Sequence, residues 1–283
     1  MLIDYHVHSK FSPDSEAGFE ELAENAVRNG IDEIAITDHY EMDKNGNCSY
    51  DVDGYFEELY RLRRDYEGKL VIRAGVEIGN TFFDFSMADS IVKYPYDFVL
   101  ASAHDLGGCD LQLLDRDDSR HESYYDLQFV DFKSNKLHEV IRIYLEKLEE
   151  IVEWGKFDCL AHFDLPVRYA INQGVKLDFS VFNEKIEKIL HKLLEHGNKG
   201  LELNISGWIG SFCSGFKDTM PSKHIMKMWQ RLGGRIVTVG TDSHQSQNVG
   251  KYARKAQEFL LECGFSEIAI FEKHQPKMHS IKL

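Results

Sequence analysis

The sequence lacks a long apolar run. Its 283 residues are 43% hydrophobic and 28% charged, and the mean hydropathy is −0.38. No stretch approaches the roughly 20 apolar residues that a membrane-spanning helix needs. The chain opens on an apolar segment that carries Asp4 and His6, not on a basic segment followed by an apolar one, so we expect no signal peptide. These absences predict a soluble globular protein without a membrane partner.

Closely spaced cysteines are also missing. The five cysteines form no C-x-x-C pair, and they are Cys48, Cys109, Cys159, Cys213 and Cys263. Such wide spacing favours reduced thiols over disulfides, and we therefore expect a cytoplasmic location.

The sequence has no excess of positive charge. Its formal net charge is −14 at pH 7. Binding to a nucleic-acid backbone usually depends on Lys and Arg side chains that neutralise phosphates. The chain also has no stripe rich in basic and aromatic residues. We therefore expect no long nucleic acid as a partner, although an enzyme that holds a small phosphorylated substrate through metal ions fits this charge.

Strand-like and helix-like segments alternate along the whole chain. Apolar runs and period-two patterns predict strands over residues 1–8, 31–37, 70–78, 97–104, 158–163, 201–206, 235–242 and 268–271. Helical spacing of apolar residues predicts helices over 19–27, 55–66, 85–92, 137–154, 179–196, 221–232 and 252–263. A polar loop is expected over 41–54, a long irregular segment over 107–136, and a polar, Lys-rich tail after 271. This alternation predicts a parallel sheet in one domain that spans residues 1–283.

Polar residues cluster where the predicted strands end. The first strand carries Asp4-x-His6-x-His8, and later strands end in or near His39, Glu77, His104, His162 and Asp242-Ser243-His244. In a closed barrel the carboxyl ends of all strands open on one face, whereas the outer strands of an open sheet lie too far apart to share a site. The positions of these residues therefore favour a barrel.

These residue types are those that bind transition metals. Histidine is the commonest protein ligand of such metals, and carboxylates complete or bridge their sites. A single strand-end histidine can equally make a structural hydrogen bond, and Asp14 beside Pro13 can equally be a turn residue. As a set, nine candidate ligands exceed what one ion needs, so two or three ions are implied: His6, His8, Asp14, His39, Glu77, His104, His162, Asp242 and His244.

The same motifs resemble, in order, those of the PHP (polymerase and histidinol phosphatase) superfamily. The matching stretches are D-x-H-x-H-S at 4–9, T-D-H at 37–39, Glu77, His104, A-H at 161–162 and D-S-H at 242–244. The stretches 162–168 and 202–207 resemble the histidinol-phosphate phosphatase branch. The resemblance implies a distorted, TIM-like α/β barrel of seven β/α units that binds three divalent transition-metal ions (Zn, Mn or Fe).

The family pattern also implies a distribution of the ligands. His6, His8, Glu77 and Asp242 would hold the first ion; Glu77, as a bridge, with His104 and His162 would hold the second; Asp14, His39 and His244 would hold the third. Some relatives have histidine where this chain has Asp14. Asp4 and Asp38 are predicted to orient neighbouring imidazoles, and Glu77, Asp242 and His244 are predicted to be catalytic.

Arginine residues near this set are candidates for substrate binding. Arg168 follows the strand that ends in His162, and a planar guanidinium suits phosphate oxygens; a surface ion pair is the alternative. Arg116 is a second candidate, and Arg120 and His121 lie in the same irregular segment.

The resemblance to the histidinol-phosphate phosphatase branch implies metal-dependent hydrolysis of a phosphomonoester, L-histidinol phosphate, in histidine biosynthesis, and this is the function that we expect. Two alternatives remain open at this stage. One is a phosphoesterase that acts on a nucleotide or a short oligonucleotide, and the other is a non-catalytic metal-binding module.

Overall fold

A computed structural model describes residues 1–42, 48–107, 127–133, 135–210, 212 and 215–282 of the chain. Its main sheet is built from parallel strands in the hydrogen-bonded order β1-β2-β4-β5-β6-β7-β8, and the short β3 pairs with β4. The strands of the described chain are β1 (Ile3–Val7), β2 (Glu33–Ile36), β3 (His39–Glu41), β4 (Val71–Gly79), β5 (Phe98–Ser102), β6 (Cys159–Leu160), β7 (Gly200–Asn204), β8 (Val237–Gly240), β9 (Glu267–Glu272) and β10 (Gln275–Ser280).

The sheet closes on itself between its first and last strands. Val7 and Ser243 form a parallel bridge, and the amide of His8 donates to the carbonyl of Ser243 over 2.9 Å. Asp4 supports this closure, since its carboxylate accepts from the amide of Thr241 (2.9 Å), the Thr241 hydroxyl (2.6 Å) and the amide of Gly250 (2.8 Å). The predicted distorted barrel with seven strands in its ring is confirmed.

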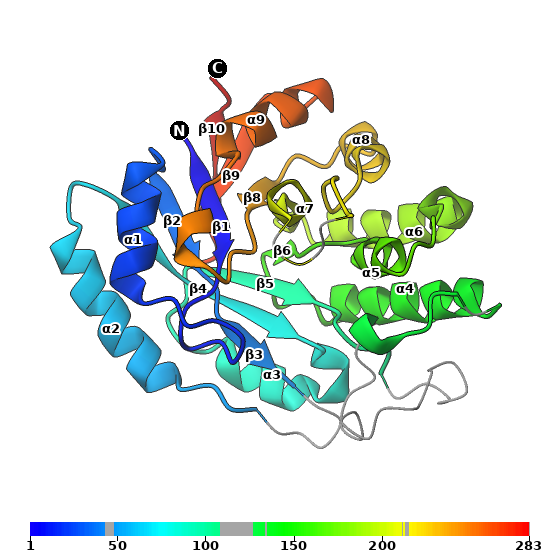
Figure 1. Ribbon diagram of the computed structural model, residues 1–283, viewed down its shortest axis with the longest axis horizontal. Coiled ribbons are helices and arrows are strands. Elements are labelled where there is room, and N and C mark those ends of the chain that lie inside the picture. Colours follow the sequence, from blue (N-terminus) through cyan, green and yellow to red (C-terminus); the bar gives the residue numbers. More distant parts are fainter. Residues whose placement is uncertain (43–47, 108–126, 134, 211, 213–214, 283) are drawn as a thin grey trace.

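Helices cover the outside of the barrel (Figure 1). They are α1 (Phe19–Arg28), α2 (Val52–Asp65), α3 (Phe85–Ile91), α4 (Leu137–Trp154), α5 (Pro166–Asn172), α6 (Asn183–Glu195), α7 (Ser206–Ile209), α8 (Lys223–Arg231) and α9 (Ala253–Glu262). Single 3₁₀ turns occur at Thr81–Phe83, Leu127–Phe129, Phe179–Phe182 and Ser246–Asn248. Among the described residues, no helix is both long enough and apolar enough to cross a membrane.

The helix α4 packs its apolar face into the core, as its sequence pattern predicts. Its apolar side chains recur every three or four residues, and those of Val140, Tyr144 and Leu148 are fully buried. The helix ends at Gly155, whose φ of +66° is a left-handed conformation that glycine adopts without strain. On its outer side Glu149 pairs with three lysines of α6, so the two helices are neighbours on the barrel surface.

Three elements differ from the predictions. β3 lies where the polar loop was expected to begin, and α5 follows His162 in a stretch for which no helix was predicted. The expected polar tail is instead β10, which pairs antiparallel with β9. Its alternating polar residues are compatible with an edge strand that faces water on one side. Most of the long segment 107–136, as well as Cys109 and Cys213, lies outside the described residues.

The β9–β10 hairpin packs against the amino-terminal end of the barrel. The hydroxyl of Tyr5 in β1 accepts from the amide of Phe271 over 2.9 Å. At the turn, the amide of His274 donates to the carbonyl of Asp97 over 2.9 Å. The imidazole Nδ1 of His274 lies 2.9 Å from a carboxylate oxygen of Asp158, just before β6. This hydrogen bond raises the pKa of His274, although its partial burial opposes the charged form.

A pH-dependent contribution to stability follows from this pair. Because the pKa of His274 is higher in the folded state, the pair stabilises fully below the unfolded-state pKa and is lost as the pH rises through the folded-state pKa. We expect His274→Gln to lower the Tm by about 2 °C near pH 6 and by much less near pH 9. Thermal unfolding followed by circular dichroism checks this, with His279→Gln on the same hairpin as the control. An equal loss at both pH values contradicts the assignment.

Candidate metal centre

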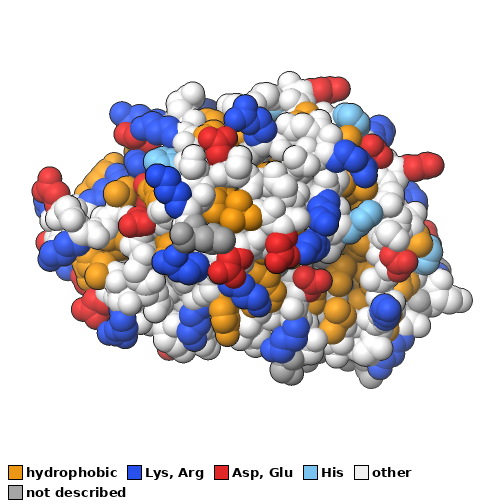
Figure 2. Space-filling view, turned by 90° about the horizontal axis from the view of Figure 1, so that it is seen from above, with side chains coloured by type: hydrophobic (Ala, Val, Ile, Leu, Met, Phe, Trp, Pro, Cys, Tyr) orange, Lys and Arg blue, Asp and Glu red, His pale blue; other side chains and the backbone are white. Residues whose placement is uncertain are grey.

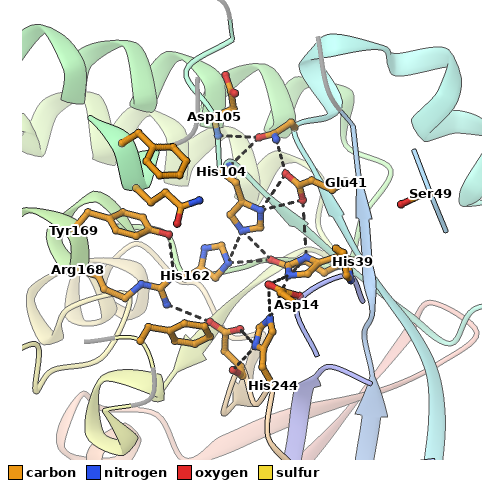
Figure 3. A pocket seen from close by; sticks show the side chains of 17 residues that line it. Asp14, His39, Glu41, Ser49, His104, Asp105, His162, Arg168, Tyr169 and His244 are labelled. Atoms are coloured by element: carbon orange, nitrogen blue, oxygen red, sulfur yellow. Dashed lines mark hydrogen bonds and ion pairs between the residues drawn. The ribbon is translucent and has the colours of Figure 1, made fainter. Parts of the chain in front are cut away.

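A cavity of about 530 Å³ opens at the carboxyl end of the barrel. Figure 3 shows histidine side chains from different strand ends pointing toward its middle, among them His39, His104, His162 and His244. Their chain positions explain the convergence, since each follows a strand of the same parallel ring. The structure therefore brings these predicted residues together at the carboxyl end of the barrel.

The first group contains the residues predicted for the first ion. Nε2 of His6 lies 3.2 Å from Oε2 of Glu77, and Nε2 of His8 lies 3.6 Å from the same oxygen. Oδ1 of Asp242 is 3.4 Å from Nε2 of His8 and 3.7 Å from Nε2 of His6. Four donor atoms from β1, β4 and the end of β8 thus surround one small volume.

The second group lies on the other side of Glu77. The Nε2 atoms of His104 and His162 are 3.2 Å apart. Both face Oε1 of Glu77, at 3.4 Å and 2.9 Å respectively. The two oxygens of Glu77 therefore face two different histidine pairs, which is the arrangement that a bridging carboxylate needs. His39 also reaches Glu77, with its Nδ1 3.0 Å from Oε2.

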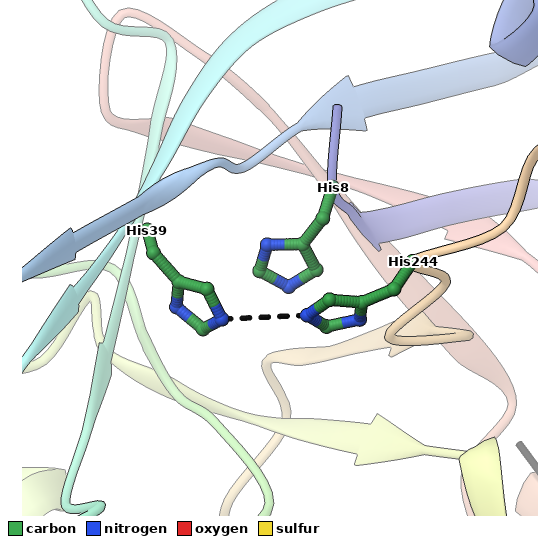
Figure 4. A group of neighbouring side chains, drawn as sticks. All are labelled: His8, His39 and His244. Atoms are coloured by element: carbon green, nitrogen blue, oxygen red, sulfur yellow. Dashed lines mark hydrogen bonds between the residues drawn. The ribbon is translucent and has the colours of Figure 1, made fainter. Parts of the chain in front are cut away.

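The third group lies at the more open side of the cavity. The Nε2 atoms of His39 and His244 are 3.4 Å apart, and His8 lies between the two rings (Figure 4). Oδ2 of Asp14 lies 3.1 Å from Nε2 of His244 and 3.6 Å from Nε2 of His39. Asp14 thus faces the group predicted for the third ion, and its side chain is 54% exposed.

The buried polar atoms of these groups fit metal ions. Nε2 of His6, Nε2 of His8, Nδ1 of His39 and Oε2 of Glu77 are all buried, and none makes a hydrogen bond. Buried polar atoms are nearly always satisfied, and leaving several unpaired in one place is costly. Imidazole nitrogens and carboxylate oxygens within 4.8 Å of one another are the donor set that divalent transition metals prefer. The site therefore suits divalent metal ions.

The carboxylates and imidazoles of the site shift one another's pKa values. Burial disfavours charge on every group, yet the surrounding imidazoles hold the pKa values of Glu77 and Asp242 well below their usual range. In turn, and against burial, the carboxylates raise the pKa of His39 to about 10 and the pKa of His6 far above its ordinary value. Burial lowers the pKa of His8, and the positive charges of neighbouring imidazoles lower it further. Divalent ions would replace these protons as the positive charges in the site.

The aspartates predicted to orient imidazoles act differently from each other. Asp38 accepts from Ser12, whose hydroxyl lies 3.0 Å from Nδ1 of His8, so it supports that ring through one intermediate. The prediction for Asp4 is wrong, because its carboxylate accepts from backbone amides and from the Thr241 hydroxyl, and among the described residues it makes no hydrogen bond to an imidazole.

Arg168 lies at the wall of the cavity. It is buried, and its Nη1 donates to Asp242 over 3.4 Å. Its guanidinium lies 4.4 Å from the centre of the Phe212 ring and also contacts Tyr169. Nε of Arg168 is buried without a hydrogen bond. The other predicted arginine, Arg116, lies outside the described residues, as do Arg120 and His121.

Sequence analysis missed Glu41 and Glu202. A carboxylate oxygen of Glu41 lies 3.1 Å from Nδ1 of His104, and Glu202 lies 2.6 Å from Nδ1 of His6. Glu41 stands two residues after His39 in β3, so a period-two pattern would have placed both on one face had that strand been predicted. Glu202 lies in the stretch 202–207, but its own sequence context carries no ligand pattern.

A family model described as the PHP domain matches residues 4–206. The chain belongs to the PHP domain family. Among curated PHP relatives, a probable histidinol-phosphatase of Thermotoga maritima is 30% identical over the full length of both chains. The histidinol-phosphatase of Lactococcus lactis is 28% identical, and the match covers 95% of this chain and 94% of the relative.

Solved structures agree with this PHP assignment. The crystal structure of the Lactococcus lactis histidinol phosphate phosphatase, complexed with zinc, L-histidinol and phosphate, has a TM-score of 0.77, is 26% identical and covers 98% of both chains. The putative histidinol phosphatase of Listeria monocytogenes has a TM-score of 0.70 at 22% identity and covers 89% of this chain and 98% of its own. At that identity the second comparison supports the fold alone.

Metal binding should be visible as thermal stabilisation. A ligand that binds only the folded state stabilises it by mass action, so Zn²⁺ or Mn²⁺ at about a hundredfold excess over its Kd should raise the Tm by about 5 °C. Glu77→Gln should remove most of this increase, since both groups that share Glu77 lose a charged donor. Differential scanning calorimetry with and without metal checks this, with Glu272→Gln on the exposed hairpin as the control. A metal-dependent increase that survives Glu77→Gln contradicts a central role for this carboxylate.

Proposed function

We propose that this PHP protein is a metal-dependent phosphatase that hydrolyses L-histidinol phosphate to L-histidinol and phosphate, a reaction of histidine biosynthesis. The observation that carries the proposal is the convergence of six imidazoles and three carboxylates at the carboxyl end of the barrel, where four of the imidazoles, the three carboxylates and a buried guanidinium line one cavity. Similarity over almost the whole chain to histidinol-phosphatases, one of them solved with zinc, L-histidinol and phosphate, supports the choice of substrate.

Three divalent ions, each Zn, Mn or Fe, would occupy the three groups of ligands. The first would be held by His6, His8, Glu77 and Asp242, and the second by Glu77, His104 and His162. The third would be held by Asp14, His39 and His244. The short distances within each group support this distribution. When bound, the ions would lower the pKa of a water molecule and neutralise charge on the phosphoryl oxygens.

Side chains of the protein would bind and orient the phosphoryl group. Hydrolysis forms a bond from a water oxygen to phosphorus and breaks the ester P–O bond, and the released alkoxide takes up a proton. Arg168 would bind phosphoryl oxygens, because a guanidinium offers paired donors to them. Its hydrogen bond to Asp242 keeps it at the cavity wall. Glu77, Asp242 and His244 would be catalytic because they would hold the metal ions that face the phosphoryl group.

The distribution of charge on the surface favours a small substrate over a long nucleic acid. Figure 2 shows Lys and Arg side chains mixed with Asp and Glu over one face of the molecule, without a continuous basic stripe on that face. The net charge of −14 likewise disfavours binding to a nucleic-acid backbone.

We extend the proposal to the organisation and location of the protein. One hydrophobic cluster runs from Ile3 to Phe271, which supports a single domain over residues 1–283. Cys159 and Cys263 are buried thiols that form no disulfide, which suits the cytoplasm.

Activity assays test the proposal directly. Purified protein supplied with Zn²⁺ or Mn²⁺ should release phosphate from L-histidinol phosphate, and a nucleotide diester assayed in parallel should be a poor substrate. His104→Ala should lower kcat by about a thousandfold or more, because it removes a ligand next to the reacting phosphoryl group. Preference for the diester, or full activity of His104→Ala, refutes the proposal.

The role of Arg168 has a separate test. Arg168→Lys keeps the charge but loses the paired donors, so we expect KM for L-histidinol phosphate to rise about tenfold or more. Metal content should stay the same as in the unmodified protein. Arg142→Lys on the exposed face of α4 is the matched control. An unchanged KM and kcat for Arg168→Lys would assign Arg168 to structure alone.

A further inference from the structure

Glu202 is a buried carboxylate whose partners include two candidate metal ligands. It lies in β7, and 1% of its surface is exposed. Oε1 lies 2.6 Å from Nδ1 of His6, and Oε2 accepts from the backbone amide of His162 over 2.9 Å. Glu202 belongs to none of the three ligand groups, and its two oxygens are occupied by these contacts and by the amide of Asn204.

The contact with His6 selects the tautomer of that ring. A ligating imidazole is neutral, and the proton of such a His6 ring lies on Nδ1, because the neighbouring carboxylate oxygen of Glu202 accepts the hydrogen bond there. Nε2 is then left with a free lone pair, and this atom is the one that faces Oε2 of Glu77 at 3.2 Å. A carboxylate hydrogen-bonded to the far nitrogen of a ligating histidine also fixes the ring and raises its basicity.

The contact with His162 supports an unusual backbone. The φ of His162 is +24°, in a region that residues with a side chain seldom adopt. Such a conformation persists only when surrounding contacts hold it. The charge-assisted hydrogen bond from the His162 amide to Glu202 is a contact of this kind, and it fixes the turn that directs the His162 imidazole toward Glu77.

The neighbouring strand is shaped to admit this carboxylate. Gly240 in β8 lies beside Glu202 and His6, and a Cβ at that position would clash with Oε1 of Glu202 and with Cβ of His6. Any larger residue would therefore push the pair apart. The close approach of three strands at this point explains why glycine is needed there.

We propose that Glu202 is a positioning residue of the metal centre, which orients His6 through its ring and His162 through its backbone. Through these two residues it serves both ligand groups that share Glu77. The inference rests on the proposed function in that it takes His6 and His162 to be metal ligands. It goes further by assigning a role to a residue outside the three ligand groups.

To test this role, the metal affinity of Glu202→Gln is compared with that of the unmodified protein. The amide keeps the shape of the side chain, but only one of its two terminal atoms, the oxygen, can accept a hydrogen bond. We expect Zn²⁺ affinity, measured by competition with a chromophoric chelator, to fall by about 10- to 100-fold. The visible absorption of the Co²⁺-loaded protein should change as well, because ligand orientation sets it.

Glu33→Gln is the matched control. Glu33 is an equally buried carboxylate that begins β2 at the opposite end of the barrel, where it accepts from Tyr5 and Arg73. Its loss should lower thermal stability without altering Zn²⁺ affinity or the Co²⁺ spectrum. This separates positioning of the ligands from general destabilisation.

The outcomes are distinguishable. If the unmodified protein binds neither Zn²⁺ nor Co²⁺, the proposed function itself fails. If it binds them and Glu202→Gln binds them equally well with the same spectrum, only the role of Glu202 is overturned. Should Glu202→Gln fail to fold, Glu202→Asp keeps the charge but withdraws the carboxylate by one methylene, and the same loss of affinity is expected; unchanged affinity in that variant overturns the role.

Discussion

The parallel closure between β1 and β8 is the constraint on which the rest of the structure depends. It joins the two ends of the strand ring through the Val7–Ser243 bridge and the hydrogen bonds of Asp4. Without it, His6 and His8 from the start of the chain would not meet Asp242 and His244 from its last third. The proposed metal centre is thus a product of topology, because its candidate ligands come from strands far apart in sequence.

Glu77 is the carboxylate around which the histidine ligands are arranged. It is fully buried, and each of its oxygens faces a different pair of histidines. A lone carboxylate in such a place would be strongly destabilising, and so would the buried imidazolium groups around it. They are tolerated because opposite charges lie within 4 Å of one another, and divalent ions would take over the role of the positive partners. Binding of metal and stability of the fold are therefore expected to depend on the same few contacts.

Much of this arrangement could be predicted from the sequence, for physical reasons. A histidine directly after an apolar run marks a strand end, and alternation of strands with amphipathic segments such as 137–154 implies a barrel. Partners across the barrel could not be predicted in this way. That Asp4 supports the closure and Glu202 reaches His6 depends on which strands become neighbours. The strand β3, with three residues, is too short to give a periodic signal. Arg116 remains a prediction, since it lies outside the described residues.

The measurement that tests the central claim most directly is a crystal structure of the zinc-loaded protein with anomalous data collected on both sides of the zinc absorption edge. The account predicts three anomalous peaks at the carboxyl end of the barrel, two of them flanking Glu77 and one beside Asp14, His39 and His244. Peaks elsewhere, or no peak within coordination distance of Glu77, would contradict it.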